Sequence, residues 1–203
     1  MKFKELLIRS GFYAESDGPE IDEISKAMSE RELKKGEYLL HEGDMNTNIY
    51  FLEKGFCRVF TDRNDKEVIT WFLSKQDFIL CINCYYLNAP SKEYIQALED
   101  CRLIYIERAA YTELVLKYAK LNMFAMTALV RKLFLYQQHC EFLRDMTVQE
   151  RFQYLKDKKP ELINKVSQKH LASFLGVEPT YLNKIINKEK YFDYESRSGY
   201  SDN

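Results

Sequence analysis

The sequence predicts an α+β protein in which an antiparallel β-roll precedes a long helix and a C-terminal helix-turn-helix. Between about residues 34 and 110, short runs rich in β-branched and aromatic residues are separated by turn dipeptides. From Ala109 to Met146 there is no glycine or proline, and the apolar residues follow a helical period. Two short helical patterns then meet at a glycine within residues 167–188. Because 203 residues exceed one typical domain of about 100 to 150 residues, we expect two packed units.

The composition narrows the class of protein. The 30 basic and 31 acidic residues nearly cancel, so the overall charge indicates neither a polyanion nor a membrane surface as the partner. The first residues lack the apolar run of a signal peptide, and no later stretch is long enough to span a membrane, so we expect a cytoplasmic protein. The five cysteines are an odd set outside a small secreted scaffold, which predicts thiols and no disulfide framework.

The N-terminal half is expected to hold a helical arm over 1–33 and the β-roll over 34–110. The runs "EYLLHEGD", "NIYFLEKGFCRVFT", "EVITWFLS", "YIQALED" and "CRLIYIE" are the predicted strands. Residues 77–100, "DFILCINCYYLNAPSKEYIQALED", alternate like two strands around a turn. Several short strands at this spacing favour a small antiparallel barrel or roll.

A long helix is expected over 111–145, with apolar residues on two faces. One face repeats at steps of four and three residues, which is typical of a coiled-coil seam. We define this seam as Met126, Leu129, Leu133, Tyr136, Cys140 and Leu143, preceded by Asn122. The second stripe consists of Phe124, Ala128, Leu135 and Phe142. We expect the stripe to pack on the chain's own roll and the seam to form a homodimer interface. The alternative is one helix buried on both sides within a monomer.

A helix-turn-helix domain is predicted over 146–190, followed by a disordered tail over 191–203. Ser167 has a hydroxyl suited to cap the first helix, and Gly176 supplies the turn at the lowest backbone cost. Pro179 stands where a second helix would begin, a position at which its missing N–H does no harm. The tail is polar and has no apolar period.

The outward positions of this domain carry short polar and basic groups suited to base edges and phosphates. The candidate DNA-binding residues are Ser167, Gln168, Lys169, His170, Pro179, Thr180, Tyr181, Asn183, Lys184 and Lys188. Within 146–190, nine Lys or Arg and five Asp or Glu give a net charge of +4, so basic charge gathers where DNA would lie. The alternatives are an ordinary helical hairpin and terminal helices that bind a protein partner.

These parts, in this order, resemble the cyclic-AMP receptor protein / fumarate-nitrate regulator superfamily of bacterial transcription regulators. The resemblance covers about residues 30–188. It rests on the helix-turn-helix, the closing "IQALEDCRLIYI" and the opening "LKKGEYLLHEGDMNTNIYFLEKGFCRVF", with Gly36, Gly43, Asp44, Tyr50 and Gly55. It implies a cyclic nucleotide-binding-like roll of the double-stranded β-helix (jelly-roll, cupin-like) type. It also implies a DNA-binding homodimer that acts on double-stranded DNA with RNA polymerase, without a cofactor.

The same resemblance places a candidate effector pocket at Phe78, Leu80, Cys81, Ser91 and Lys92. Nucleotide-binding relatives carry Phe-x-Gly-Glu, then Arg-Ser/Thr; the Glu holds the ribose and the Arg pairs with the phosphate. Here Cys81 replaces the Glu and Ser91 the Arg, so both charged contacts are missing. We therefore expect no useful cyclic-AMP binding. The pocket is then either a filled remnant or a site for a less charged ligand, and an altered nucleotide pocket remains an alternative.

The cysteines and histidines offer little catalytic chemistry. Cys81-x-x-Cys84 has metal-ligand and redox spacing, which leaves a cysteine-based redox sensor as an alternative, but iron–sulfur relatives need a tighter cysteine run that this chain lacks. His41, His139 and His170 are too few for a cupin metalloenzyme. We expect no metal site and no enzyme activity.

Overall fold

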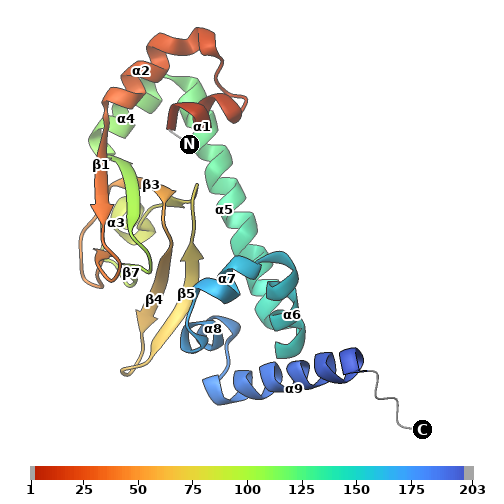
Figure 1. Ribbon diagram of the computed structural model, residues 1–203. Coiled ribbons are helices and arrows are strands. Elements are labelled where there is room, and N and C mark those ends of the chain that lie inside the picture. The colour runs from red at the N-terminus through yellow and green to blue at the C-terminus, as the bar shows by residue number, and fades with distance from the viewer. Residues whose placement is uncertain (1–2, 199–203) are drawn as a thin grey trace. The chain divides into compact units, whose positions relative to one another are not determined.

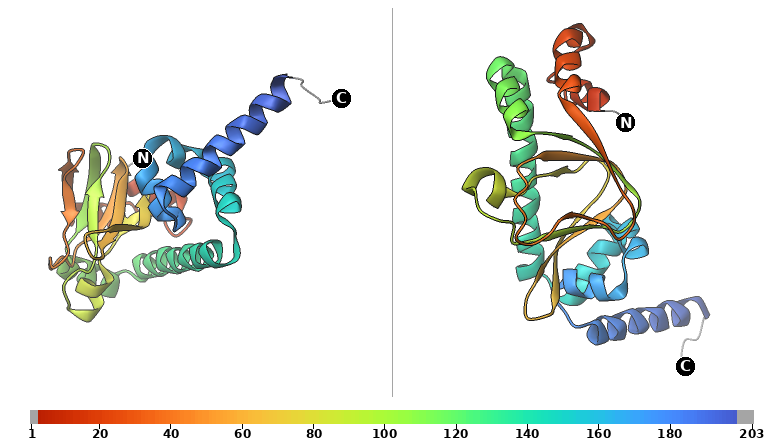
Figure 2. Two further views of the ribbon diagram at one scale, coloured as in Figure 1. Left: turned by 90° about the horizontal axis from the view of Figure 1, so that it is seen from below. Right: turned by 90° about the vertical axis from the view of Figure 1, so that its left-hand side faces the viewer.

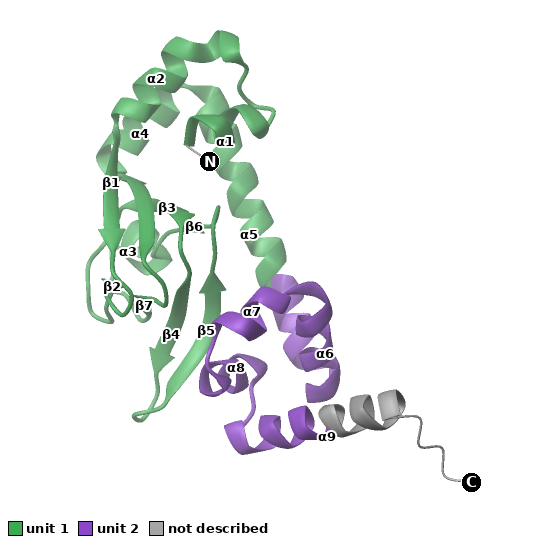
Figure 3. Ribbon diagram, viewed as in Figure 1, with its two compact units in different colours: residues 1–136 green, residues 137–203 purple. Residues whose placement is uncertain are grey.

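The computed structural model describes residues 3–198, with the side chains of 3–188, and divides the chain into two compact units (Figure 3). Unit 1 comprises residues 1–136 and unit 2 residues 137–203. The chain is α+β, with an antiparallel β-roll, then a long helix, then several C-terminal helices (Figure 1), as the sequence predicts.

Unit 1 contains two four-stranded antiparallel sheets. Their orders are β1-β8-β3-β6 and β2-β7-β4-β5. The strands are β1 (Met28–Leu33), β2 (Tyr38–Leu40), β3 (Ile49–Lys54), β4 (Cys57–Asp62), β5 (Glu67–Leu73), β6 (Phe78–Ile79), β7 (Tyr94–Ala97) and β8 (Cys101–Ile106). Inward residues such as Leu52, Leu73 and Leu103 form the core of the roll. Figure 2 shows these strands curling into one body.

The N-terminal arm is helical only as far as Lys26, so the prediction of a helical arm to residue 33 is wrong at its end. It consists of α1 (Phe3–Arg9), η1 (Glu15–Asp17) and α2 (Gly18–Lys26). Met28–Leu33 lacks a clear alternation, yet every residue of this strand pairs with β8. The ladder to β8 therefore supplies the backbone partners that decide its conformation.

The segment 77–100 is not the expected pair of strands. Between the two-residue β6 and the four-residue β7 lies a helix, α3 (Ile82–Leu87), that ends at Asn88 in the left-handed conformation with φ +49°. Asparagine tolerates this conformation better than most residues, so α3 ends here without a glycine.

The predicted single helix over 111–145 is divided into α4 (Arg108–Lys117) and α5 (Ala119–Asp145), so this prediction is corrected at Tyr118. Tyr118 is extended, with φ −122° and ψ 97°, and its hydroxyl donates to Glu23 of α2 over 2.6 Å. Lys117 also donates to Glu23, over 2.6 Å. Two hydrogen bonds to Glu23 of the arm thus accompany the break between α4 and α5. No glycine or proline near Tyr118 predicts this break from the sequence.

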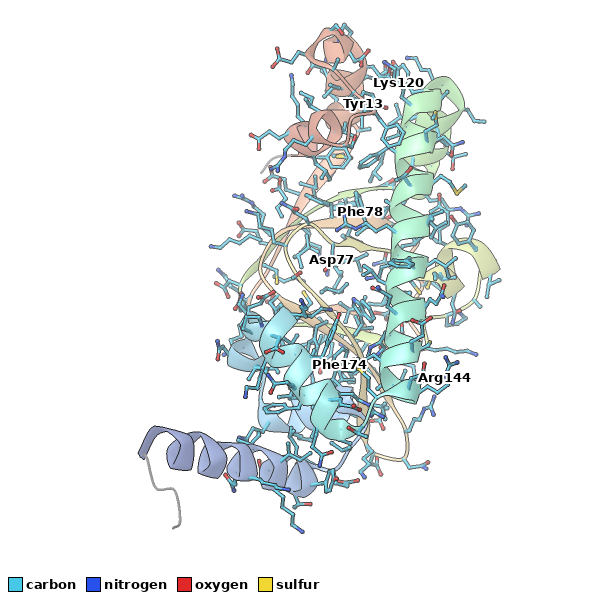
Figure 4. All side chains as sticks on the ribbon, turned by 90° about the vertical axis from the view of Figure 1, so that its right-hand side faces the viewer. Tyr13, Asp77, Phe78, Lys120, Arg144 and Phe174 are labelled. Atoms are coloured by element: carbon cyan, nitrogen blue, oxygen red, sulfur yellow. The ribbon has the colours of Figure 1, made fainter. Side chains whose placement is uncertain are left out.

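The arm and the start of α5 are held together on the outer face of the β1-β8-β3-β6 sheet. Phe3, Ile24, Phe51 and Phe124 belong to one buried apolar cluster there. Lys120 pairs with Asp17 over 2.7 Å and lies 5.9 Å from the ring centre of Tyr13 (Figure 4). These contacts fix the first turns of α5 against the roll.

Unit 2 continues α5 into α6 (Val148–Lys158), α7 (Pro160–Lys165), α8 (Gln168–Leu175) and α9 (Pro179–Ser198). Thr147 and Glu150 form a reciprocal capping box at the start of α6. The predicted disordered tail over 191–203 is wrong for 191–198, where the backbone continues α9, because the first glycine after Pro179 is Gly199. Residues 199–203 lie outside the described residues.

Candidate functional site

The turn between α8 and α9 is built as the sequence indicates. The Ser167 hydroxyl accepts from the His170 amide over 3.2 Å and so caps α8. Gly176 is left-handed, with φ +74°, and Val177 donates to the Ala172 carbonyl over 3.0 Å, which closes the end of α8. Pro179 is the first residue of α9.

The two helices pack through small and apolar side chains. Ala172, Leu175 and Leu182 are fully buried. Because alanine has only a methyl group, the helices approach closely at this point. The buried face fixes which side of α9 faces outward.

The ten candidate DNA-binding residues all lie at least partly in solvent within unit 2. His170 and Pro179 are half-buried, and the other eight are exposed. On α9, Thr180, Asn183 and Lys184 share the face opposite Leu182 and Ile185. The structure therefore brings short polar and basic groups onto one surface.

Arg151 of α6 is a positioning residue that the sequence does not reveal. Its guanidinium donates to the carbonyls of Met146 (3.0 Å), Leu143 (2.6 Å) and Leu175 (2.6 Å). The Leu143 and Met146 carbonyls lie at the end of α5, and the Leu175 carbonyl lies at the end of α8. One side chain therefore caps two helices. From sequence it is one of nine basic residues in this domain, and nothing local distinguishes it.

The five residues of the candidate effector pocket do not line one cavity. Phe78 packs with Phe51 and Phe124 at ring-centre distances of 5.2 and 5.8 Å, toward α5 (Figure 4). Ser91 is buried, and its hydroxyl donates to the Glu93 carbonyl over 2.8 Å. Lys92 is exposed, Leu80 lies along a surface groove, and Cys81 packs against the core of the roll.

The cavity that Cys81 itself lines is small, whereas Phe78 and Leu80 line a separate groove of ≈ 760 Å³ along α5. Tyr50, Ile79 and Ile95 surround a cavity of only ≈ 10 Å³, about the room for one water. The Ser91 amide donates to the Asp44 carbonyl, and the Gly43 amide donates to the Ser91 carbonyl, each over 2.9 Å. The backbone of Ser91, in the loop that would face a ligand, is therefore hydrogen-bonded to the segment at Gly43 and Asp44.

A polar cluster lies where the roll meets α5, and the sequence singled out only its Tyr136, as a residue of the seam. Thr70 donates to the Glu93 carboxylate over 3.2 Å, and the Lys132 ammonium lies 4.8 Å from the centre of a Trp71 ring. Burial raises the pKa of Glu93, although the Thr70 bond and the Lys132 charge oppose this. Burial also raises the pKa of Tyr136 to about 12. We call Thr70, Trp71, Glu93, Lys132 and Tyr136 the junction cluster.

The α5 seam is exposed in the described part of the chain. Met126 is 55% and Leu133 67% exposed, and Leu129, Cys140 and Leu143 are also exposed. Tyr136 is 40% exposed because only one side of its ring packs, 4.8 Å from Trp71. Phe124 and Leu135 of the second stripe instead pack on the roll, whereas Phe142 packs with His139 and Phe174 in unit 2. Within each unit, the second stripe packs and the seam stays open to solvent.

No helix within residues 3–198 is long and apolar enough to cross a membrane. Among the described side chains, no three of His, Cys, Asp and Glu come together as a metal-ligand set.

Comparison with known proteins places the fold. Residues 30–118 match the family model of the cyclic nucleotide-binding domain. Four structural neighbours, CooA, FixK2, CLP and a catabolite activator protein of Thermus thermophilus, are regulators of the cyclic-AMP receptor protein / fumarate-nitrate regulator family, as the sequence resemblance suggested. A search of curated protein sequences gave no match.

Three solved structures illustrate the similarity. The regulator CLP of Xanthomonas campestris, described as responsive to c-di-GMP, is 16% identical, with a TM-score of 0.70 over 87% of this chain and 93% of its own. FixK2 of Bradyrhizobium japonicum is 15% identical, with a TM-score of 0.68 over 82% and 86%. A CooA mutant from Carboxydothermus hydrogenoformans is 19% identical, with a TM-score of 0.66 over 83% and 79%.

Proposed function

We propose that this chain is a sequence-specific DNA-binding transcription regulator that acts as a homodimer and recruits or contacts RNA polymerase. The observation that carries the proposal is the α8–Gly176–α9 arrangement with its outward Thr180, Asn183 and Lys184. A helix presenting such groups fits the major groove, where amides and ammonium groups bond base edges. The net charge of +4 over 146–190 adds attraction to phosphates.

Dimerisation is part of the same proposal. An exposed apolar seam on a long helix is costly in water and is typical of a surface that a second helix covers. Two copies would present two recognition helices to successive major grooves, about 34 Å apart on one side of the duplex. A near-palindromic operator is the expected target.

We further propose that the roll does not bind cyclic AMP. The two charged contacts expected from the family are absent, and hydrogen bonds to charged groups are worth about 1.5 to 3 kcal/mol each. Their loss weakens binding by roughly a hundredfold to ten-thousandfold. The small cavity beside Cys81 and the Ser91 loop, whose backbone bonds to Gly43 and Asp44, support a remnant over an open nucleotide site.

Fluorescence anisotropy tests the proposal. The full chain should bind random duplex at low salt and should bind a selected near-palindromic duplex more tightly, with light scattering giving a dimer on DNA. A protein that binds no duplex at low salt would instead favour terminal helices that bind a protein. Calorimetry with cyclic AMP should give no heat, whereas micromolar binding would establish the altered-pocket alternative.

A further inference from the structure

The described cysteines include one pair that touches across the two sheets of the roll. Cys57 begins β4 and Cys101 begins β8, which belong to different sheets. Their sulfur atoms lie 3.5 Å apart, although 44 positions separate them in sequence. Both residues are buried, and all five cysteines of the chain are free thiols.

We propose that Cys57 and Cys101 are a reversible dithiol–disulfide site that cross-links the two sheets of the roll when the cell becomes oxidising. The proposal concerns unit 1 alone and is independent of DNA binding. Inter-sheet disulfides are an established way to join β-sandwiches, which shows that the architecture accommodates such a bond. Here the contact is already formed between the thiols.

The thiol of Cys101 also contacts the backbone of the turns that precede β4 and β8. Its sulfur lies 3.7 Å from the Phe56 carbonyl and 3.2 Å from the Glu99 carbonyl. The contact with Cys101, then burial, raises the pKa of Cys57, whereas the contact with Cys57 lowers the pKa of Cys101. The 3.5 Å between the two sulfur atoms means that whichever thiol reacts first, the other is in place to complete the disulfide.

Access comes from the end of the roll. Gly55 has φ +107°, and a side chain at this position would collide with Cys101. The pairing of β3 with β8 is irregular between Leu52 and Lys54, next to this turn. A short turn over an irregular strand end opens more easily than the centre of a sheet, so a small oxidant reaches the pair by local opening.

The reaction balances with a low-molecular-weight disulfide as the oxidant. One cysteine of the pair, as its thiolate, attacks one sulfur of the external disulfide and releases one small thiol. The other cysteine then attacks the mixed disulfide, forms the Cys57–Cys101 bond and releases the second small thiol. The external disulfide gains two electrons and two protons, and the protein loses both thiol hydrogens.

Differential alkylation of the full chain tests the site. The folded protein is incubated with oxidised glutathione, unfolded with iodoacetamide, then reduced with dithiothreitol and labelled with N-ethylmaleimide before peptide mapping. Cys57 and Cys101 should carry the second label to equal extents. Before labelling, the oxidised chain should be lighter than the reduced chain by two hydrogen atoms. Dithiothreitol alone should restore the first label. The oxidised protein should unfold about 5 °C higher or more, because the bond constrains the unfolded chain.

Two variants and one contrary result complete the test. Cys101→Ser should leave Cys57 with the first label, and Cys81→Ser should leave the Cys57–Cys101 bond unchanged. Should a variant fail to fold, the mapping of the unaltered chain still decides. Three results would each overturn the proposal. They are the first label on both Cys57 and Cys101 after oxidation, a glutathione adduct that does not convert to a disulfide within the chain, and a Cys81–Cys84 bond in place of the Cys57–Cys101 bond.

Discussion

The Arg151 guanidinium and the Leu175 carbonyl are joined by a hydrogen bond of 2.6 Å, which ties the start of α6 to the end of α8. The same guanidinium reaches Leu143 at the end of α5. In unit 2, the last turn of the long helix and the turn before α9 therefore share one charged donor. Any shift at the end of α5 is opposed through these bonds.

Replacing Arg151 should destabilise unit 2. Arg151→Gln removes charge-assisted bonds to two helix ends, so we expect a loss of about 3 kcal/mol in the free energy of unfolding. Urea unfolding of the full chain measures it. The matched control is Arg144→Gln, because Arg144 is exposed and its guanidinium pairs with Asp145, its neighbour in sequence. Equal effects of the two substitutions would contradict a capping role for Arg151.

Cys140 should report the proposed dimer. It lies on the seam at a position where two parallel copies of α5 face each other across the axis, and it is exposed. Mild oxidation with copper phenanthroline should give a cross-linked dimer on a non-reducing gel. Moving the thiol with Gln138→Cys in a Cys140→Ser background should abolish the cross-link, because residue 138 points away from the seam. An uncross-linked native chain would refute this parallel seam.

Two lysines should separate base recognition from phosphate attraction. Lys184→Ala should reduce the preference for the selected duplex over random duplex by roughly tenfold or more, because the ammonium is placed to reach base edges. Lys158→Ala should keep that preference and lower the salt slope by about one. Anisotropy titrations at several salt concentrations measure both quantities. A flat salt dependence for the unaltered chain would rule out the DNA proposal.

Glu93 should make the stability of unit 1 depend on pH. Burial raises the pKa of its carboxyl from 4.5, so the folded chain holds this proton more tightly than the unfolded chain. Well below pH 4.5 the carboxyl is protonated in both the folded and the unfolded chain, so it does not lower the free energy of unfolding. As pH rises, the carboxyl ionises first in the unfolded chain, and the free energy of unfolding falls. Glu93→Gln removes this penalty, so its stability advantage should grow from about pH 4 to pH 7.

Thermal unfolding across that pH range measures the effect. Glu113→Gln is the control, because Glu113 is exposed on α4. An advantage of Glu93→Gln that is constant or that shrinks with rising pH would show that Lys132 outweighs burial at the junction cluster.

Features with local causes were predictable. Ser167, Gly176 and Pro179 mark the cap, turn and start of the two helices because caps and turns depend on groups within a few residues. The period of the α5 seam is likewise a property of consecutive residues, and its exposure follows from the pattern. The substitutions at Cys81 and Ser91 already indicated a changed pocket.

The rest depended on residues distant in sequence. Met28–Leu33 became a strand because β8 offered it a ladder, and the helix broke at Tyr118, where that residue and Lys117 bond to Glu23. The contacts of Arg151 with Leu175, of Glu93 with Thr70 and of Cys57 with Cys101 join different elements of the fold. The distances between these groups depend on how the elements pack. That packing results from many weak contacts, which no short sequence pattern encodes. The local sequence thus determined the α8 cap, the turn at Gly176 and the face of α9, whereas tertiary packing decided the β1 strand, the break at Tyr118 and which polar groups meet.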